Sequence, residues 1–393
     1  MTTDANRTTA ALSPTAKQEA ARLRIYSFSI YTIMAVIVSY IPLYFHDRGF
    51  SEQQIGILYS IGPALSIFAN LIMGMASDKY RTIRRIMTLL LFGQLLMVAL
   101  LFSAQEFFIV CLIMGGFYFF QTPLNPLNDS LILLSVKHTG RSYPSIRIFG
   151  SLGFAMAALF IGLFLGSSGS GTTMIVLMLA VSVSLALTFT LKDYQGSLRK
   201  MEFSGFFKLV RKPDVVTFFF LIMIISTAHR MNEGFLAIIM RQMGASESLI
   251  GIAWMASSIS EIPILYLLGK YGHKFKELPL LAIAGLFYAV RFWFLSEMTS
   301  PGWAILIQAM HSITFGIFFS TALRYMTTLI PDEFRASGQA LYAVVWMGFS
   351  GLLSGLLGGY VLEQIGQTTF FYVAMGLSLL ASAGFMLKHL RSR

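Results

Sequence analysis

Hydrophobic residues run through the chain in long blocks, and short polar stretches separate one block from the next. A membrane-spanning helix needs about 20 mostly apolar residues in a row. The pattern predicts twelve such helices, at about 24–45, 54–76, 84–104, 107–135, 145–166, 173–191, 215–240, 249–269, 278–296, 302–329, 337–361 and 369–388. The sequence therefore predicts an all-α membrane protein with twelve transmembrane helices.

A repeat divides the predicted helices into two sets. The segment 51–57 returns with similar residues at 246–252, an offset of 195, and the same offset relates Gly74 to Gly269. We therefore expect two parallel, pseudo-symmetric six-helix bundles with a substrate site between them near the middle of the bilayer. The predicted parts are an N-terminal cytoplasmic tail, a first bundle, a cytoplasmic linker and a second bundle, at 1–23, 24–191, 192–214 and 215–393.

The composition agrees with a chain that is solvated by lipid. Only 12% of the residues are charged and 56% are hydrophobic, whereas a soluble domain carries about 25% charged residues. These values exclude a soluble enzyme and a disordered protein. The single cysteine, Cys111, cannot form an internal disulfide.

The net charge of +11 would suggest nucleic acid as a partner if the protein were soluble. Of the 29 Lys and Arg residues, however, 23 lie in the two tails and in the loops on their side of the membrane. Two lie in the opposite loops and four lie inside helices. The positive-inside rule therefore predicts a plasma membrane protein with both termini in the cytoplasm and no nucleic-acid partner.

Charged residues inside the predicted helices are the candidates for function, because a charge at mid-bilayer costs roughly 2.5–3.5 kcal/mol on insertion scales. Asp129, late in one helix, and Arg147, early in the next, can face each other across a hairpin. Such a pair, flanked by Asn125 and Asn128, would present a bidentate polar site. The alternative is a structural salt bridge. Two glycines near Arg147 would allow tight helix packing, Gly150 and Gly153.

A second group lies in the second half, where Glu261, Arg291 and His311 fall on three successive predicted helices with Thr314 nearby. A buried Glu near an Arg and a His can take up and release a proton as its surroundings change. We expect a proton-coupling site here, and a static ion pair is the alternative.

A local cluster in the seventh predicted helix, His229, Arg230 and Glu233, has either a structural role or a role in the site. Arg324 lies near the cytoplasmic end of its helix, where we expect its long side chain to extend to the membrane surface.

The loop after the second predicted helix reads Gly74, three residues, Asp78 and Lys79, followed by basic residues that include Arg84 and Arg85. It resembles the loop signature of the major facilitator superfamily, although Arg81 stands where that family usually has Gly. A carboxylate at this helix end would form a latch that stabilises one of two conformations. An ordinary positive-inside loop is the alternative.

The resemblance extends from about residue 25 to 390, to the lactose permease branch and to the phenylpropionate permease family of proton symporters. Its motifs here are Pro123-Leu-x-Pro-Leu-x-Asp129 and Gln308-x-x-His-x-x-Thr-Phe315. The resemblance implies alternating-access proton symport, with Phe154 at the position of a substrate-stacking aromatic. It also implies that Asp129 and Arg147, together with the neighbouring Asn125 and Asn128, help to bind the substrate. Thr314 stands where the lactose permease has a carboxylate, so Glu261 is the best remaining proton carrier.

We therefore expect a monomeric symporter that uses a proton gradient and no cofactor or metal to move an aromatic acid, a sugar or a nucleoside. An exporter, or a flippase for lipids or glycolipids, on the same fold is the alternative. A membrane enzyme is disfavoured because the six His residues have no metal-ligand spacing.

Overall fold

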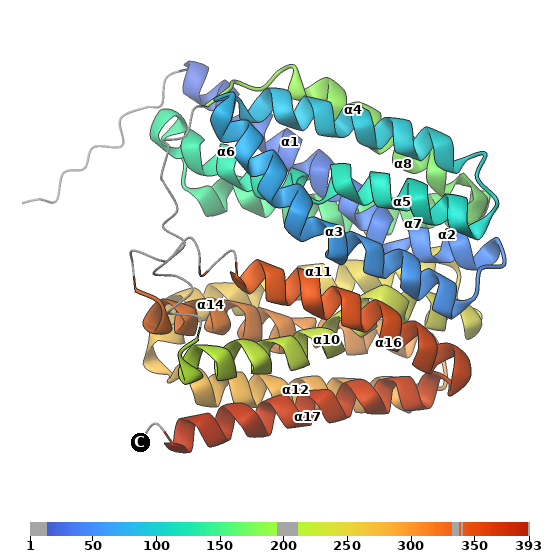
Figure 1. Cartoon of the computed structure of the whole chain (residues 1–393), viewed down its shortest axis with the longest axis vertical. Coiled ribbons are helices and arrows are strands. Elements are labelled where there is room, and N and C mark those ends of the chain that lie inside the picture. The colour runs from blue at the N-terminus through green and yellow to red at the C-terminus, as the bar shows by residue number, and fades with distance from the viewer. Residues whose placement is uncertain (1–13, 195–210, 332–337, 339–340, 392–393) are drawn as a thin grey trace, which may run out of the picture.

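The computed structural model describes residues 14–194, 211–331, 338 and 341–391. Within these ranges the chain is helical, and twelve segments are long and apolar enough to cross a membrane. The predicted fold class is therefore confirmed. Figure 1 shows the first half of the chain, in blue to green, packed above the second half, in yellow-green to red.

The helices of the first half are α1 (Pro14–Ser39), α2 (Ile41–Asp47), α3 (Glu52–Lys79), α4 (Ile83–Leu101), α5 (Phe107–Gln121), α6 (Leu124–Thr139), α7 (Tyr143–Ser168), the short η1 (Ser170–Thr172) and α8 (Thr173–Thr188). The second half contains α10 (Pro213–Gln242), α11 (Glu247–Tyr271), η2 (Gly272–Lys274), α12 (Glu277–Ser296), α13 (Trp303–Ala309), η3 (Ser312–Gly316), α14 (Ile317–Leu329), η5 (Val344–Phe349), α16 (Ser350–Gln364) and α17 (Gln367–Arg391).

The first helix begins earlier than the apolar block predicts, because an amphipathic extension precedes that block. Ala16, Ala20 and Leu23 are spaced one turn apart and are buried. On the polar side, the Tyr194 hydroxyl donates to Glu19 at 2.7 Å, and burial together with this bond raises the pKa of Tyr194. Residues 14–23 thus belong to the first bundle rather than to a tail, and the rest of the predicted tail lies outside the described residues.

Four predicted helices are interrupted. The predicted 24–45 helix consists of α1, which ends at Ser39, and α2, which begins at Ile41. The predicted 107–135 helix consists of α5 and α6, which are separated at Thr122 and Pro123, because proline cannot donate the backbone hydrogen bond that would continue the helix. The predicted 302–329 and 337–361 helices contain the π-helical turns η3 and η5. The beginning of the latter, and most of the predicted linker, lie outside the described residues.

The repeated segment has a structural basis in helix capping. At the beginning of α3 the Ser51 hydroxyl accepts a hydrogen bond from the amide of Gln54, at 3.3 Å. At the beginning of α11 the Ser246 hydroxyl accepts from the amide of Leu249 at the same distance. The two serines therefore start equivalent helices in the two halves by the same N-cap.

The two halves pack together at one end of the molecule, which we call the closed end. There α3 lies against α16 and α7 lies against α11. A Cβ on Gly56 would collide with the carbonyl of Gly355, and a Cβ on Gly251 would collide with the carbonyl of Ala158. Close approach of the helix backbones at this end therefore depends on glycine.

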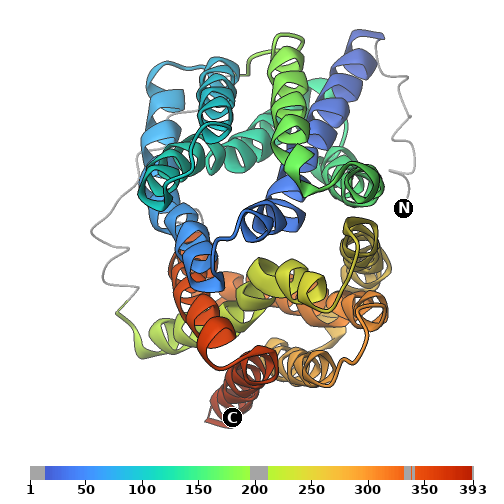
Figure 2. The same cartoon turned by 90° about the vertical axis from the view of Figure 1, so that its right-hand side faces the viewer.

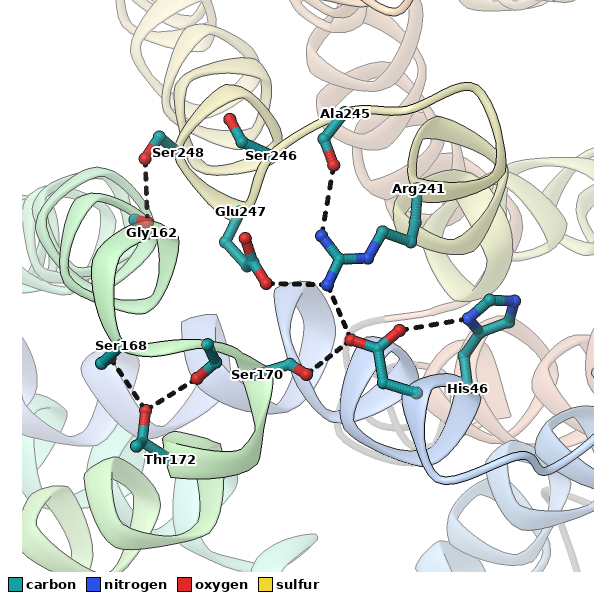
Figure 3. Close-up of polar contacts among 12 residues, drawn as sticks. His46, Gly162, Ser168, Ser170, Thr172, Arg241, Ala245, Ser246, Glu247 and Ser248 are labelled. Carbon is teal, nitrogen blue, oxygen red and sulfur yellow. Dashed lines mark hydrogen bonds and ion pairs between the residues drawn. The ribbon is translucent and has the colours of Figure 1, made fainter.

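An ion cluster joins the halves at the closed end (Figure 3). Arg241, at the end of α10, donates to Asp47 of α2 at 2.7 Å and to Glu247 of α11 at 2.9 Å. Ser170 also donates to Asp47, at 2.5 Å. Figure 2 looks onto this end and shows the beginning of α11 lying beside the first half.

The halves separate toward the opposite end, which we call the open end and which holds both Pro14 and Arg391. On α3, Ser60 is buried, whereas Leu71 and Met75 farther along the helix are 48% and 55% exposed. On α11, Gly251 packs against Ala158 of α7, whereas Leu265, farther along the same face of the helix, is 42% exposed. The structure is therefore closed between the halves at one end only.

Candidate functional site

The first half places Asp129 of α6 beside Arg147 of α7. The Arg147 Nε atom lies 3.4 Å from Asp129 Oδ1, and both side chains are about one-third exposed or less. The guanidinium lies 4.1 Å from the centre of the Tyr31 ring on α1, a distance typical of a cation–π contact. The pair is thus positioned by three helices and is reachable by a solute.

Glycine brings α7 close to α1. A Cβ on Gly150 would meet the Tyr31 ring at 2.7 Å, and a Cβ on Gly153 would overlap the backbone of Phe28. The prediction of tight packing at these two glycines is confirmed. This packing holds Tyr31 against Arg147.

The neighbouring polar residues differ in their partners. Asn128 is buried and donates to Ser27 of α1 at 3.3 Å, so it connects α6 to α1. The side-chain oxygen of Asn125 is buried and has no hydrogen-bond partner among the described residues. Phe154 lies edge to face with Trp254 of the second half, with ring centres 6.4 Å apart.

The second half contains a buried network around Arg291, which is 1% exposed. Its guanidinium donates to Gln308, to Thr314 at 3.1 Å and to His311 Nδ1 at 3.2 Å. Because arginine can only donate, Nδ1 of His311 is the acceptor and the ring proton is on Nε2. Nε2 lies 2.8 Å from Glu261 Oε1, so the neutral histidine donates to the Glu261 carboxylate.

The third predicted cluster joins this network. His229 Nε2 lies 3.6 Å from Glu233 Oε1, and Arg230 donates to the other Glu233 oxygen at 3.3 Å. The rings of His229 and His311 are stacked, with centres 5.4 Å apart. Residues from α10, α11 and α12 and the turn at η3 therefore form one polar group.

The constellations of the two halves meet across the interface. Ser258 of α11 donates to the carbonyl of Ser151 of α7, at 3.3 Å. Glu261 follows Ser258 by one turn, Arg147 precedes Ser151 by one turn, and their charges are close enough to interact. A solute bound between the halves could therefore contact both groups.

The loop between α3 and α4 has a feature that the sequence did not reveal. Asp193 accepts from the backbone amides of Ile83 and Arg84 and from the Thr82 hydroxyl, so it caps α4. A carboxylate at a helix N-terminus is favoured by the helix dipole. Arg84 also donates to the carbonyl of Leu191, at 3.1 Å.

Arg81 is the only described non-glycine residue with a positive φ, 54°. This backbone conformation favours glycine, which explains physically why glycine suits the position. The Asp78 side chain is outside what the structure describes, so the latch formed by Gly74, Asp78, Lys79, Arg84 and Arg85 stays a prediction.

Arg324 has a carboxylate partner that the sequence pattern does not predict. Its Nε atom lies 2.9 Å from Glu277 Oε1 at the start of α12. Tyr31, Trp254 and Tyr288 were also missed. The signal for the last two was their helical spacing, because Trp254 lies two turns before Glu261 and Tyr288 one turn before Arg291.

The model of the MFS_1 like family matches residues 20–373, most of the chain. The chain belongs to this family. It is therefore a membrane-spanning transporter of the major facilitator superfamily, as the sequence motifs imply.

Curated relatives of this MFS_1 like protein carry named substrates. It is 27% identical over 365 residues to the maltose permease of Geobacillus stearothermophilus, covering 88% of this chain and 89% of the relative. It is 26% identical over 355 residues to the probable 3-phenylpropionic acid transporter of Escherichia coli (strain K12), covering 88% and 92%. Among solved structures, the nucleoside transporter NupG has a TM-score of 0.81 at 18% identity, covering 94% of this chain and 98% of that one, which shows a shared fold.

Proposed function

We propose that the protein is a proton-coupled symporter of a small organic solute and that it works by alternating access. The observation that carries the proposal is the contact of Glu261 with His311 at 2.8 Å, beside buried Arg291 and close to Arg147 of the other half. A carboxyl group at such a position senses both a proton and a bound solute. The named substrates of the relatives favour a sugar, an aromatic acid or a nucleoside.

In this mechanism the first half binds the solute. Asp129 and Arg147 supply opposite charges for hydroxyl or carboxylate groups, and Asn125 has a free acceptor oxygen. Phe154 and Tyr31 supply aromatic surfaces next to these groups. Asn128 acts indirectly, because its bond to Ser27 fixes the orientation of α6.

The second half handles the proton. Protonation of Glu261 removes its negative charge, which weakens its attraction for Arg147 in the other half. Arg291 keeps His311 oriented toward Glu261, and Thr314 supports Arg291 by accepting one of its hydrogen bonds. A change in the proton on Glu261 therefore alters the force between the halves.

We further propose that the open end faces the cytoplasm and that the protein is a monomer in the plasma membrane. Support comes from the distribution of Lys and Arg, which are concentrated in the tails and in the loops at that end. The closed end, with the Asp47–Arg241 contact, then faces outward.

The test is uptake into liposomes that contain the purified protein. A pH gradient is imposed, and labelled maltose, 3-phenylpropionic acid and uridine are offered in turn. We expect one of them to accumulate with proton movement in the wild type. In E261Q we expect loss of proton-driven accumulation with retention of solute exchange. The proposal is wrong if E261Q accumulates solute like the wild type, or if solute leaves against its gradient as protons enter.

A further inference from the structure

The second half contains two groups built on the same plan. The Glu261 unit consists of Glu261, His311 and Arg291, and the Glu233 unit consists of Glu233, His229 and Tyr288. In each unit the histidine Nε2 points to a carboxylate, at 2.8 Å for His311 and 3.6 Å for His229. In each unit Nδ1 lies beside a fixed partner, Arg291 at 3.2 Å or the Tyr288 hydroxyl at 3.1 Å.

The two units are in direct contact through their histidine rings. The ring centres lie 5.4 Å apart with an angle of 27° between the planes. Phe315 stacks on both rings, at 5.1 Å and 4.9 Å, so the pair lies in aromatic surroundings with little screening of charge. Two protonated rings at this distance would repel each other strongly.

The charges of the cluster limit how many protons it can hold. With both histidines neutral, the charges of Glu233 and Glu261 are balanced by those of Arg230 and Arg291. One added proton gives a net charge of +1, and a second must bind against that charge. The groups that face the Glu233 unit are Arg230 on α10, Tyr288 and Arg291 on α12, Glu261 on α11, His311 beside η3, Tyr342, and Tyr59 on α3.

The two carboxylates lie at different depths. Glu233 precedes the closed end of α10 by nine residues, and Glu261 follows the closed end of α11 by fourteen. At about 1.5 Å per residue, Glu233 is about 7 Å nearer the closed end. It lines a cavity of about 40 Å³ between the halves, together with Tyr59 and Arg230, and this cavity has room for a water molecule.

We propose that the Glu233 unit is a second proton site, and that it shares one exchangeable proton with the Glu261 unit. Glu233 exchanges this proton on the side of the closed end, and Glu261 exchanges it on the side of the open end. Only O–H and N–H bonds form and break, because the proton taken up at one unit comes from water and the proton released at the other returns to water. This proposal rests on the coupling role proposed for Glu261.

The direct test is infrared titration of protonated carboxyl groups in the reconstituted full chain without solute. In E261Q we expect a titrating carboxyl signal to remain, and in the E233Q/E261Q double variant we expect that signal to disappear. In E233Q the midpoint of the remaining signal should fall by about one pH unit, because a neighbouring negative charge is gone. The conservative variant E233D should restore the wild-type midpoint.

The matched control is E277Q, which removes a carboxylate that is paired with a cation on a neighbouring helix far from the two units. Its titration should match that of the wild type. The inference is overturned if E233Q also titrates like the wild type, or if E261Q alone removes the signal.

Measurements of proton-driven uptake distinguish failure of the proposed function from failure of the second proton site. If E261Q retains proton-driven uptake, the proposed function fails. If E261Q loses it while E233Q keeps the wild-type rate and pH profile, only the second proton site fails. We expect E233Q to slow proton-driven uptake at least tenfold and to shift its pH profile, while solute exchange continues.

Discussion

The two halves share one architecture and differ in where they hold charge. In the first half, Asp129 and Arg147 form a partly exposed pair beside a tyrosine. In the second half, Arg291 and His311 are buried in a network of aromatic rings and hydrogen bonds. At the repeat offset of 195, the position equivalent to Glu261 in the first half is Ser66.

This difference shows that the repeat preserves the helical scaffold but not the charged residues, which differ in kind and in burial between the halves. An exposed ion pair exchanges its partner readily for a ligand, because water already screens it. A buried network does not, since breaking it leaves groups without partners. This contrast agrees with the roles proposed above, solute binding for the first half and proton transfer for the second.

The largest loss of stability is expected for Arg291→Ala, which tests whether the buried network holds the second half together. This change leaves His311, Gln308 and Thr314 without their donor and opens a cavity, so we expect a loss of about 2–5 kcal/mol in stability. Thermal unfolding in detergent should show a clearly lowered midpoint together with loss of coupled uptake. A variant as stable as the wild type would show that the network does not hold this half together.

Arg147→Ala should affect solute binding more than stability. The pair is partly exposed, whereas Arg291 is buried, so we expect Arg147→Ala to lower the thermal unfolding midpoint less than Arg291→Ala does. The solute loses its charged partner, so we expect no measurable solute binding in a thermal-shift assay. Intact affinity would demote the Asp129–Arg147 pair to a structural bridge.

Thr314→Val tests whether Thr314 only supports Arg291 or takes part in proton coupling directly. It keeps the shape of the side chain and removes one acceptor from Arg291, so we expect a loss of about 1 kcal/mol. Proton-driven uptake should persist at a reduced rate, because Thr314 does not carry the proton. Complete loss of uptake would instead assign Thr314 a direct role in coupling.

The smallest effect is expected for Arg324→Gln, which removes an ion pair at the open end that takes no part in the site. Its position is equivalent to that of Asp129 at the offset of 195. We expect stability within about 1 kcal/mol of the wild type and an unchanged uptake rate. A marked loss of uptake would mean that the equivalence of the two positions extends to function.

Much of this arrangement could be predicted from the sequence. The twelve spans follow from block hydrophobicity, and an acid near the end of one helix and an arginine near the start of the next are brought together by any short hairpin. The spacing of Asp129 and Arg147 therefore predicts that their side chains lie close together, as the structure shows. Residues that belong to consecutive helices are the easiest to place together.

Contacts between distant helices could not be predicted in this way. Nothing in the sequence near His229 shows that it stacks on His311, because that contact depends on the packing of α10 against the turn at η3. The extension of α1 before residue 24 was missed because a short amphipathic stretch with few large residues resembles a polar tail. Asp193 was missed because a cap from a distant segment leaves no local pattern.

The π-helical turn Ser312–Gly316 has a consequence for the whole of α14. A π turn holds one residue more than an α turn, and each residue turns a helix by about 100°. The extra residue therefore sets the angular orientation of every side chain that follows it. If the same residues were wound as an ordinary α turn, every residue after it would be rotated by about 100°. This rotation would carry Arg324 away from Glu277 and the aromatic face of α14 away from its neighbours. The length of this turn is thus as much a determinant of the structure as its composition.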